Sequence, residues 1–197
     1  MILLGLTGSI GMGKTTVAAM FREAGVPVYD ADAAVHALYQ PGGAAVAPIG
    51  ALFPAALRDG GVDRQLLGGL VLDDPEAMNR LEQIVHPLAR QAQEAFLQAA
   101  EHTHASVVVM DVPLLFETGG DAHMDAVAVV SAPADVQRER VLARPGMTPE
   151  KLARILARQL PDQEKRRRAD FVISTTFDLA DTRAQIGAVL AVLRDAA

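Results

Sequence analysis

The sequence lacks cysteine altogether, and only 4% of its 197 residues are aromatic. Without cysteine there can be no disulfide framework, thiolate metal site or cysteine nucleophile, which fits a reducing compartment. No stretch approaches the roughly 18 consecutive apolar residues of a membrane-spanning helix. The opening MILLGLTGS is apolar, but it has no basic start and glycines soon interrupt it, so it predicts a strand rather than a signal peptide. We expect a cytoplasmic protein with no membrane contact.

Positive charge is scarce outside one segment. The net charge is −6, yet residues 138–168 hold ten basic and four acidic residues, which makes this segment +6 and the remainder −12. An acidic chain argues against general nucleic-acid binding, whereas one basic stretch indicates a local anionic ligand. The length predicts a single domain, with or without insertions, that is large enough to bury a full core.

The chain alternates short apolar runs with helical patterns. These runs are rich in β-branched or other apolar residues, and they predict strands near residues 2–7, 26–29, 105–113, 125–133 and 170–175. Helical spacing fills most of the intervals, including residues 14–25, 33–40 and the C-terminal segment from about Leu179. This order predicts an α/β fold with a buried parallel sheet wrapped by helices. Residues 41–72 are rich in glycine and alanine and show only weak periodicity.

Residues 73–102 read as one long helix. Asp73 or Asp74 is expected to cap it, with Pro75 in its first turn. Pro87 should bend or break the helix near Val85 and His86.

The segment GSIGMGKT at residues 8–15 fits the phosphate-loop pattern and lies between a predicted strand and a predicted helix. Glycines let backbone N–H groups turn toward phosphate oxygens, and the helix N-terminus adds positive potential. Lys14 should reach the β- and γ-phosphates, and the Thr15 hydroxyl should ligate Mg²⁺. The expected cofactors are therefore ATP and Mg²⁺, and the expected binding residues are Gly8, Gly11, Met12, Gly13, Lys14, Thr15 and Thr16.

Asp111 closes the apolar run VVVMD, where a second acid often serves the metal of phosphate-loop proteins. It is expected either to steer Mg²⁺ or hold the loop, or to cap the following turn. Both interpretations stay open from the sequence.

Two carboxylates, Asp30 and Asp32, follow the second predicted strand. Ligands of doubly wound sheets gather at the carboxyl ends of strands, so Asp32 is placed to accept a proton from an acceptor hydroxyl. One cap suffices for the next helix, and Asp30 can provide it. Arg154 and Arg158 are one helical turn apart, and such cations can cover a transferring phosphoryl group, although most of the basic segment is expected to be solvated.

Together with GLTGSIGMGKTTV, the motifs DADAAVHALY, LEQIVHP, DVPLLFE, QRERVLAR, RILARQ and KRRRADFVI resemble the dephospho-CoA kinase family along nearly the whole chain. The resemblance implies ATP-dependent phosphorylation of the ribose 3′-hydroxyl of dephospho-CoA, the last step of coenzyme A synthesis. It also implies a three-layer P-loop kinase domain over residues 1–197 with a five-stranded parallel sheet. Residues 33–100 would form a helical acceptor subdomain, and residues 138–168 a lid.

The same resemblance implies roles for single residues. Asp32 would be the general base, Lys14 would act on the phosphates, Arg140 would contact the transition state, and Arg144 would lie near the nucleotide. Leu114, Leu115 and Phe116 would form an apolar wall beside the acceptor, or else a buried corner after a strand. Glu117 and His86 would be polar contacts to the acceptor, although a structural hydrogen bond at the helix break is favoured for His86. These expected acceptor contacts are Asp32, His86, Leu114, Leu115, Phe116 and Glu117.

Two departures from the family pattern are visible. After ADFVI the chain continues with Ser174 to Thr176, which puts the expected contact to the nucleotide base in doubt, and Met12 replaces a commonly smaller loop residue. Two alternatives remain: another small-metabolite or nucleotide kinase of this fold, and a P-loop NTPase switch. A monomer or weak homo-oligomer is expected, with a small molecule as its only partner.

Overall fold

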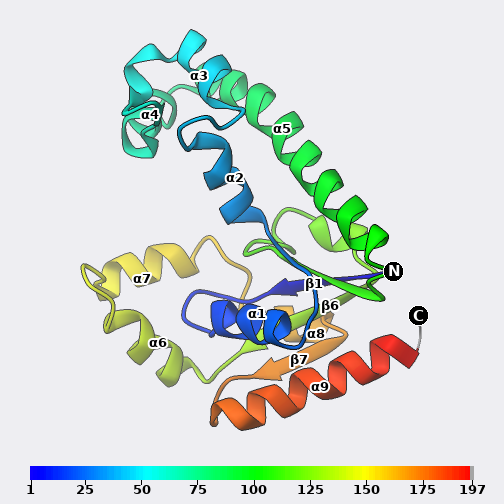
Figure 1. Cartoon of the computed structure of the whole chain (residues 1–197). Coiled ribbons are helices and arrows are strands. Elements are labelled where there is room, and N and C mark those ends of the chain that lie inside the picture. Colours follow the sequence, from blue (N-terminus) through cyan, green and yellow to red (C-terminus); the bar gives the residue numbers. More distant parts are fainter. Residues whose placement is uncertain (196–197) are drawn as a thin grey trace. The chain divides into compact units, whose positions relative to one another are not determined.

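The computed structural model describes residues 1–195, and these divide into two compact units (Figure 1). One unit comprises Met1–Tyr29 together with the chain from Ala100 onward, and the other comprises Asp30–Ala99. Each unit has its own apolar core.

The first unit is built on a five-stranded sheet with strand order β2-β5-β1-β6-β7. Its strands are β1 (Ile2–Thr7), β2 (Val28–Asp30), β5 (Val107–Asp111), β6 (Ala126–Ser131) and β7 (Phe171–Ser174). Parallel pairing joins β1 to β5, β1 to β6 and β6 to β7. All five predicted strands are present, and the predicted parallel α/β sheet is confirmed. Leu6 pairs with Asp111, so the carboxyl ends of β1 and β5 lie at the same level.

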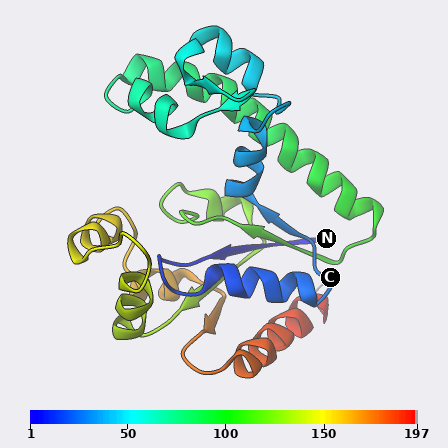
Figure 2. The same ribbon diagram turned by 60° about the vertical axis from the view of Figure 1, so that its left-hand side comes forward.

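Both faces of this sheet are covered, which explains why the strands read as continuous apolar runs. In β6, Ala128 and Val130 pack in one core cluster, whereas Val127 and Val129 pack in another. Helices α1 (Lys14–Glu23) and α9 (Leu179–Asp195) lie together and fill the first cluster (Figure 2). The second cluster lies under the loop after β5 and the segment around α8 (Asp162–Arg168). The predicted three layers are therefore α1 with α9, the sheet, and the loop after β5 together with the segment around α8.

The basic segment holds three short helices: α6 (Ala134–Leu142), α7 (Pro149–Leu156) and α8. A 3₁₀ turn, η2 (Gly120–His123), lies between β5 and β6.

The second unit is mainly helical. It contains α2 (Ala31–Tyr39), α3 (Val46–Leu52), the 3₁₀ turn η1 (Pro54–Ala56), the hairpin of β3 (Leu57–Arg58) and β4 (Gly61–Val62), α4 (Arg64–Val71), and most of α5 (Pro75–His102). The weak periodicity of residues 41–72 did not predict α3, α4 or the hairpin. One signal was there: Asp59 and Gly60 adopt positive φ of 51° and 80°, as the Asp-Gly pair of a tight hairpin turn favours.

Helix α5 is continuous through Pro87, so it does not break near Val85 and His86, and the alternative expectation of a bend there stays a prediction. Proline removes the hydrogen bond to the carbonyl four residues earlier, that of Gln83, and both residues lie on the exposed side of the helix where water can solvate this carbonyl. The start of the helix was predicted correctly. The Asp74 carboxylate accepts the N–H groups of Glu76 and Ala77 at 3.0 Å each, and Pro75 is the first helical residue.

Candidate active site

The phosphate loop lies between β1 and α1, and close packing requires its glycines. Gly11 and Gly13 adopt φ of 79° and 93°, the left-handed region that favours glycine. A Cβ on Gly11 would lie 2.5 Å from the Val141 side chain, and one on Gly8 would lie 2.7 Å from the Val130 carbonyl. The loop is therefore pressed against β6 and α6.

Several backbone donors of this loop face no protein acceptor. Among residues 1–195, the N–H groups of Gly11, Gly13, Lys14 and Thr15 donate to no protein atom. Gly13 is the N-cap residue of α1, and no side chain caps this helix end. Unsatisfied N–H groups and the positive end of a helix form a ready anion site.

Lys14 and Asp111 meet at the base of the loop. The Lys14 Nζ donates to the Asp111 carboxylate, whose side chain is only 4% exposed. Adjacent strands bring them together, because Lys14 follows β1 and Asp111 ends β5. This pairing favours the interpretation that Asp111 belongs to the phosphate-loop site, and its role toward Mg²⁺ stays a prediction.

Met12 points away from the open side of the loop. Its side chain is buried in the core of the unit, and its sulfur accepts the Ala132 N–H at 3.1 Å. The Met12 carbonyl accepts the Thr175 hydroxyl at 2.8 Å. Met12 thus fixes the loop from below without crowding its donors.

Arg140 of α6 is anchored on Thr175. Its guanidinium donates to the Thr175 hydroxyl at 2.8 Å and to the Thr175 carbonyl at 2.7 Å. Since Thr175 also holds Met12, this residue links α6, β7 and the phosphate loop. Thr175 lies in the stretch after ADFVI where the chain departs from the family pattern.

A pocket of about 330 Å³ opens beside this link, within the usual range for small-ligand sites. It brings together five of the predicted nucleotide or catalytic residues with the β7–α9 connection. Its lining residues are Gly11, Gly13, Thr16, Arg140, Arg144, Thr175, Phe177, Leu179 and Thr182.

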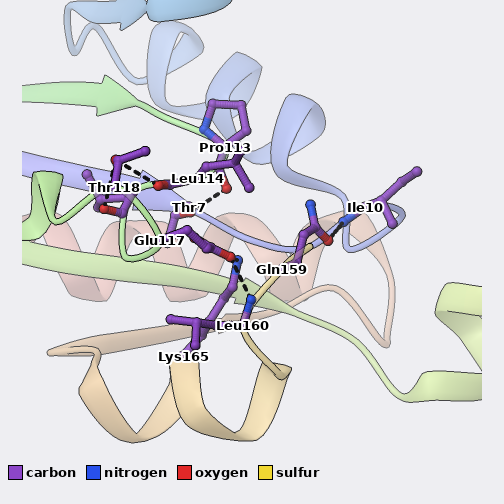
Figure 3. A network of polar contacts seen from close by, with 10 residues as sticks. Thr7, Ile10, Pro113, Leu114, Glu117, Thr118, Gln159, Leu160 and Lys165 are labelled. Atoms are coloured by element: carbon purple, nitrogen blue, oxygen red, sulfur yellow. Dashed lines mark hydrogen bonds and ion pairs between the residues drawn. The ribbon is translucent and has the colours of Figure 1, made fainter. Parts of the chain in front are cut away.

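The loop after β5 carries the residues expected to face the acceptor. Leu114 is exposed, whereas Leu115 and Phe116 are 1% and 5% exposed and pack in the core under the sheet. Their burial favours the interpretation as a buried corner after a strand. The Thr7 hydroxyl donates to the Pro113 carbonyl at 3.1 Å and ties this loop to β1 (Figure 3).

Glu117 points inward to two protein donors. Its Oε1 lies 2.8 Å from the Lys165 Nζ and accepts the Leu160 N–H, also at 2.8 Å (Figure 3). Burial alone raises the pKa of Glu117, but these hydrogen bonds outweigh it and hold the pKa below its ordinary value. Its predicted contact to the acceptor stays a prediction.

The remaining predicted residues belong to the other unit. Asp30 caps α2, where its carboxylate accepts the Ala33 N–H at 2.9 Å, and this confirms that one cap suffices. Asp32 follows in the first turn of α2 with an exposed side chain, and His86 is exposed on α5. The roles of Asp32 as base and of His86 as acceptor contact stay predictions.

Comparison with known proteins places this chain among nucleotide-dependent kinases. A sequence model described as dephospho-CoA kinase matches residues 2–181. The dephospho-CoA kinase of Rhodopseudomonas palustris is 60% identical over 190 residues, which cover 96% of this chain and 94% of the relative. That of Mesorhizobium japonicum is 57% identical over 194 residues, 98% of each chain. The chain belongs to the dephospho-CoA kinase family.

Solved structures agree with this membership. The crystal structure of TT1252 from Thermus thermophilus has a TM-score of 0.81 and 38% identity, and the match covers 98% of this chain and 97% of that one. The dephospho-CoA kinase from Campylobacter jejuni, 23% identical, shares the fold with a TM-score of 0.66 over 97% and 96% of the two chains.

As a member of the dephospho-CoA kinase family, the chain is an ATP-using phosphotransferase of coenzyme A biosynthesis. The predicted kinase activity is confirmed, and the alternative of an NTPase switch is set aside. No helix in residues 1–195 is long and apolar enough to cross a bilayer.

Reasoning from the sequence missed several residues that shape the dephospho-CoA kinase site. Three polar side chains form hydrogen bonds with the phosphate loop: Thr175, Gln137 and Gln159. They are 163, 127 and 149 residues away in sequence from their partners in the loop. Polar residues of this kind are common on surfaces, so only the fold reveals their partners. The motifs QRERVLAR and RILARQ, quoted for the family resemblance, did contain Gln137 and Gln159, and Thr175 lies in the stretch from Ser174 to Thr176 singled out after ADFVI.

Proposed function

We propose that the chain transfers the γ-phosphoryl group of Mg-ATP to the ribose 3′-hydroxyl of dephospho-CoA, with the phosphate loop holding ATP and Asp32 receiving the hydroxyl proton. One observation carries the proposal: four backbone N–H groups, those of Gly11, Gly13, Lys14 and Thr15, have no acceptor among residues 1–195 and lie beside the Lys14–Asp111 pair. Such donors suit the oxygens of a triphosphate, and their fixed positions cost no reorganisation during transfer.

Lys14 contributes positive charge at the same place. Its side chain is 18% exposed and has one carboxylate partner, so two of its three N–H donors can reach phosphate oxygens. Contact with the γ-phosphate stabilises the charge that spreads over the equatorial oxygens as the bond to the leaving group breaks.

The donor set also fits Mg²⁺, which prefers oxygen ligands and keeps several waters. Thr15 presents a hydroxyl on the exposed first turn of α1, and Asp111 supplies a carboxylate close by. Described residues 1–195 contain no group of three or more acidic or histidine side chains that could hold a metal by themselves, which suits an ion bound largely through phosphates. When bound, Mg²⁺ neutralises charge on the β- and γ-phosphate oxygens.

Arg140 and Arg144 are proposed nucleotide contacts. The guanidinium of Arg140 has five N–H donors and gives two of them to Thr175, which leaves three for phosphate oxygens. Arg144 is exposed on the wall of the same pocket. The proposed contact of Arg140 to the transition state requires the phosphates to extend toward this wall.

The helical unit is proposed to bind the acceptor, with Asp32 and His86 as its polar contacts and Leu114 as the exposed apolar contact of the loop after β5. For the lid, Arg140 and Lys165 are tied to the body of the first unit near the two ends of residues 138–168. We therefore place the proposed lid movement in the middle of this segment. A cytoplasmic location and a monomer or weak homo-oligomer complete the proposal.

A panel of acceptors tests the reaction. ADP release from Mg-ATP should require dephospho-CoA and should not occur with nucleoside monophosphates, shikimate or water. Release that needs no acceptor, or that needs a nucleoside monophosphate, would contradict the proposal.

Asp32→Asn tests the proposed base, with Asp30→Asn as its matched control. Loss of a general base lowers kcat by about 10²- to 10⁴-fold, while ATP affinity should stay within about threefold because the proposed base acts on the acceptor hydroxyl and not on the triphosphate. Asparagine remains a good N-cap, so Asp30→Asn should keep the helix and most of the activity. Equal losses of kcat and ATP affinity in Asp32→Asn would indicate a structural role.

A further inference from the structure

The turn between α7 and α8 lies against the phosphate loop. Gln159, in the middle of this turn, accepts the Ile10 N–H on its Oε1 at 3.2 Å (Figure 3). The carbonyl of Ile10 accepts the side-chain amide of Gln137 at 2.7 Å. Two glutamines, from α6 and from the α7–α8 turn, therefore hold both polar groups of one loop residue.

The position of Gln159 is fixed by its neighbour in the chain. The N–H of Leu160 donates to Glu117 at 2.8 Å, and the same carboxylate oxygen lies 2.8 Å from the Lys165 Nζ. Figure 3 shows the Lys165 side chain rising from α8 to this point beneath the turn. Glu117 thus joins the loop after β5, the α7–α8 turn and α8.

Stability alone is a weak reason for this ion pair. Lys165 is 0% exposed, and removing two charges from water costs as much as their attraction returns, so an apolar pair of similar size is commonly as stabilising. The second Glu117 oxygen, Oε2, is buried and has no hydrogen-bond partner within the described part of the chain. What the pair does provide is position: the Glu117 carboxylate accepts the Leu160 N–H and is held 2.8 Å from the Lys165 ammonium, and this fixes where the turn lies.

We propose that Gln159 is a positioning residue for phosphoryl transfer, oriented by Glu117 and Lys165, that fixes the peptide at Ile10 and so sets the directions of the loop donors that follow. The proposal rests on the proposed function in one respect, that this loop holds the triphosphate. With Ile10 N–H and C=O both occupied, the chain enters Gly11 in one orientation, which fixes where the following donors, from Gly11 to Thr15, begin. Transfer is sensitive to such alignment, because a misplacement of about 1 Å can cost a hundredfold in rate.

Gln159→Met is the direct test, since methionine keeps the side-chain length and removes the acceptor oxygen. We expect kcat to fall by about tenfold or more while the KM for ATP changes less than about threefold, because the other loop donors still bind the phosphates. Gln163→Met is the matched control. Gln163 is exposed on α8 and makes no contact in the network, so this variant should keep wild-type kinetics.

Gln159→Glu provides a second measurement, the KM for ATP, which would not change if Gln159 had a purely structural role. Glutamate keeps an acceptor for the Ile10 N–H but adds negative charge beside the triphosphate. We expect it to restore part of the kcat lost in Gln159→Met while it raises the KM for ATP.

The double variant E117M/K165M tests whether the buried pair acts through Gln159. It should keep the free energy of unfolding close to that of the wild type in urea denaturation but show the reduced kcat of Gln159→Met. Adding Gln159→Met should then lower kcat little further, because residues that act as a unit are non-additive. If E117M/K165M does not fold, Glu117→Asp, whose carboxylate is one methylene shorter, replaces it in the cycle.

Each outcome decides the proposal. Wild-type kcat in Gln159→Met, or a loss equal to that in Gln163→Met, would overturn the positioning role. Additive losses would show that Glu117 and Lys165 do not act through Gln159. A different result would contradict the proposed function: wild-type protein that neither binds Mg-ATP nor phosphorylates dephospho-CoA.

Discussion

At the residue scale, Lys165 carries the same charge as its basic neighbours but differs from them in burial. It begins a run of four cations, of which Arg166, Arg167 and Arg168 are exposed while Lys165 is fully buried. Most of the basic segment 138–168 was expected to be solvated, and the three arginines are indeed exposed. Lys165 instead serves an internal carboxylate, because its place in α8 directs it at the sheet.

The ion pair of Glu117 and Lys165 predicts a pH-dependent stability. Glu117→Gln leaves a buried lysine without a counter-ion, which costs about 3–5 kcal/mol of unfolding free energy near neutral pH. The folded-state pKa of Glu117 is lowered from its ordinary 4.5, so its ionised form contributes stability above 4.5 that is lost as the pH falls through the lowered value. The difference between wild type and variant should therefore be constant above about pH 6 and shrink in acid.

Urea denaturation of both proteins over this pH range measures the difference. Gln163→Met, on the exposed side of the same helix, should show no such pH-dependent difference from the wild type. A wild-type advantage over Glu117→Gln that stays constant down to acidic pH would contradict the assigned ion pair.

Single residues of the site were predictable where local backbone chemistry determines them. Glycine at positions 11 and 13 is required by positive φ, and the lysine and hydroxyl that follow belong to the same local pattern. Thr175 and Gln159 could not be predicted, because their partners lie more than a hundred residues away in sequence. The same limit applies to Glu117, for which the family resemblance implied a contact to the acceptor and whose partners come from α8 and the turn before it.

At the element scale, α5 carries a proline that it does not need for its start. Pro87→Ala restores an N–H donor for the Gln83 carbonyl and should raise the free energy of unfolding by about 1–2 kcal/mol, since an interior proline costs about 3 and the stiffer unfolded chain returns up to about 1. Pro75→Ala is the matched control in the same helix. Pro75 is the first helical residue, where no donor is needed, so this change should stay within about 0.5 kcal/mol.

Thermal and urea denaturation of the two variants check this prediction. Equal effects of Pro87→Ala and Pro75→Ala would mean that the helix does not lose a hydrogen bond at Gln83. Kinetics of Pro87→Ala would also show whether the adjacent His86 depends on the proline for its position.

Elements were predictable in proportion to their length and regularity. The strands were found as short apolar runs, of which β1, β5 and β6 are largely buried, and α5 was found because its apolar stripe and its cap agree. Helices α3 and α4, of seven and eight residues, are too short to show a period among so many glycines and alanines. Asp63 was an available signal, since its carboxylate accepts the N–H groups of Gln65 and Leu66 at the start of α4.

At the scale of the whole molecule, ligand binding should stabilise the unit that carries the phosphate loop. Mg-ATP at about a hundred times its dissociation constant should raise the free energy of unfolding of this unit by about 2.7 kcal/mol. Removal of Mg²⁺ with a chelator should reduce this gain, because the triphosphate charge is then neutralised only by Lys14, arginines and backbone donors.

Thermal unfolding with and without Mg-ATP measures the effect. Asp32→Asn, in the other unit, should keep the full shift, whereas Lys14→Met should lose most of it. A shift of the same size in Lys14→Met would place the nucleotide elsewhere.

The tight turn at Asp59 and Gly60 has a practical consequence for following this enzyme at work. Because the natural chain is free of thiols, Arg58→Cys beside the turn would create a unique attachment point for a fluorophore or spin label on the helical unit. Arg58 is exposed, and its ion pair with Asp63, at 3.9 Å, is of a kind that contributes little to stability. A second thiol at exposed Gln163 would complete a reporter pair, and spectroscopy during turnover could then record how the separation of the two labels responds to each substrate.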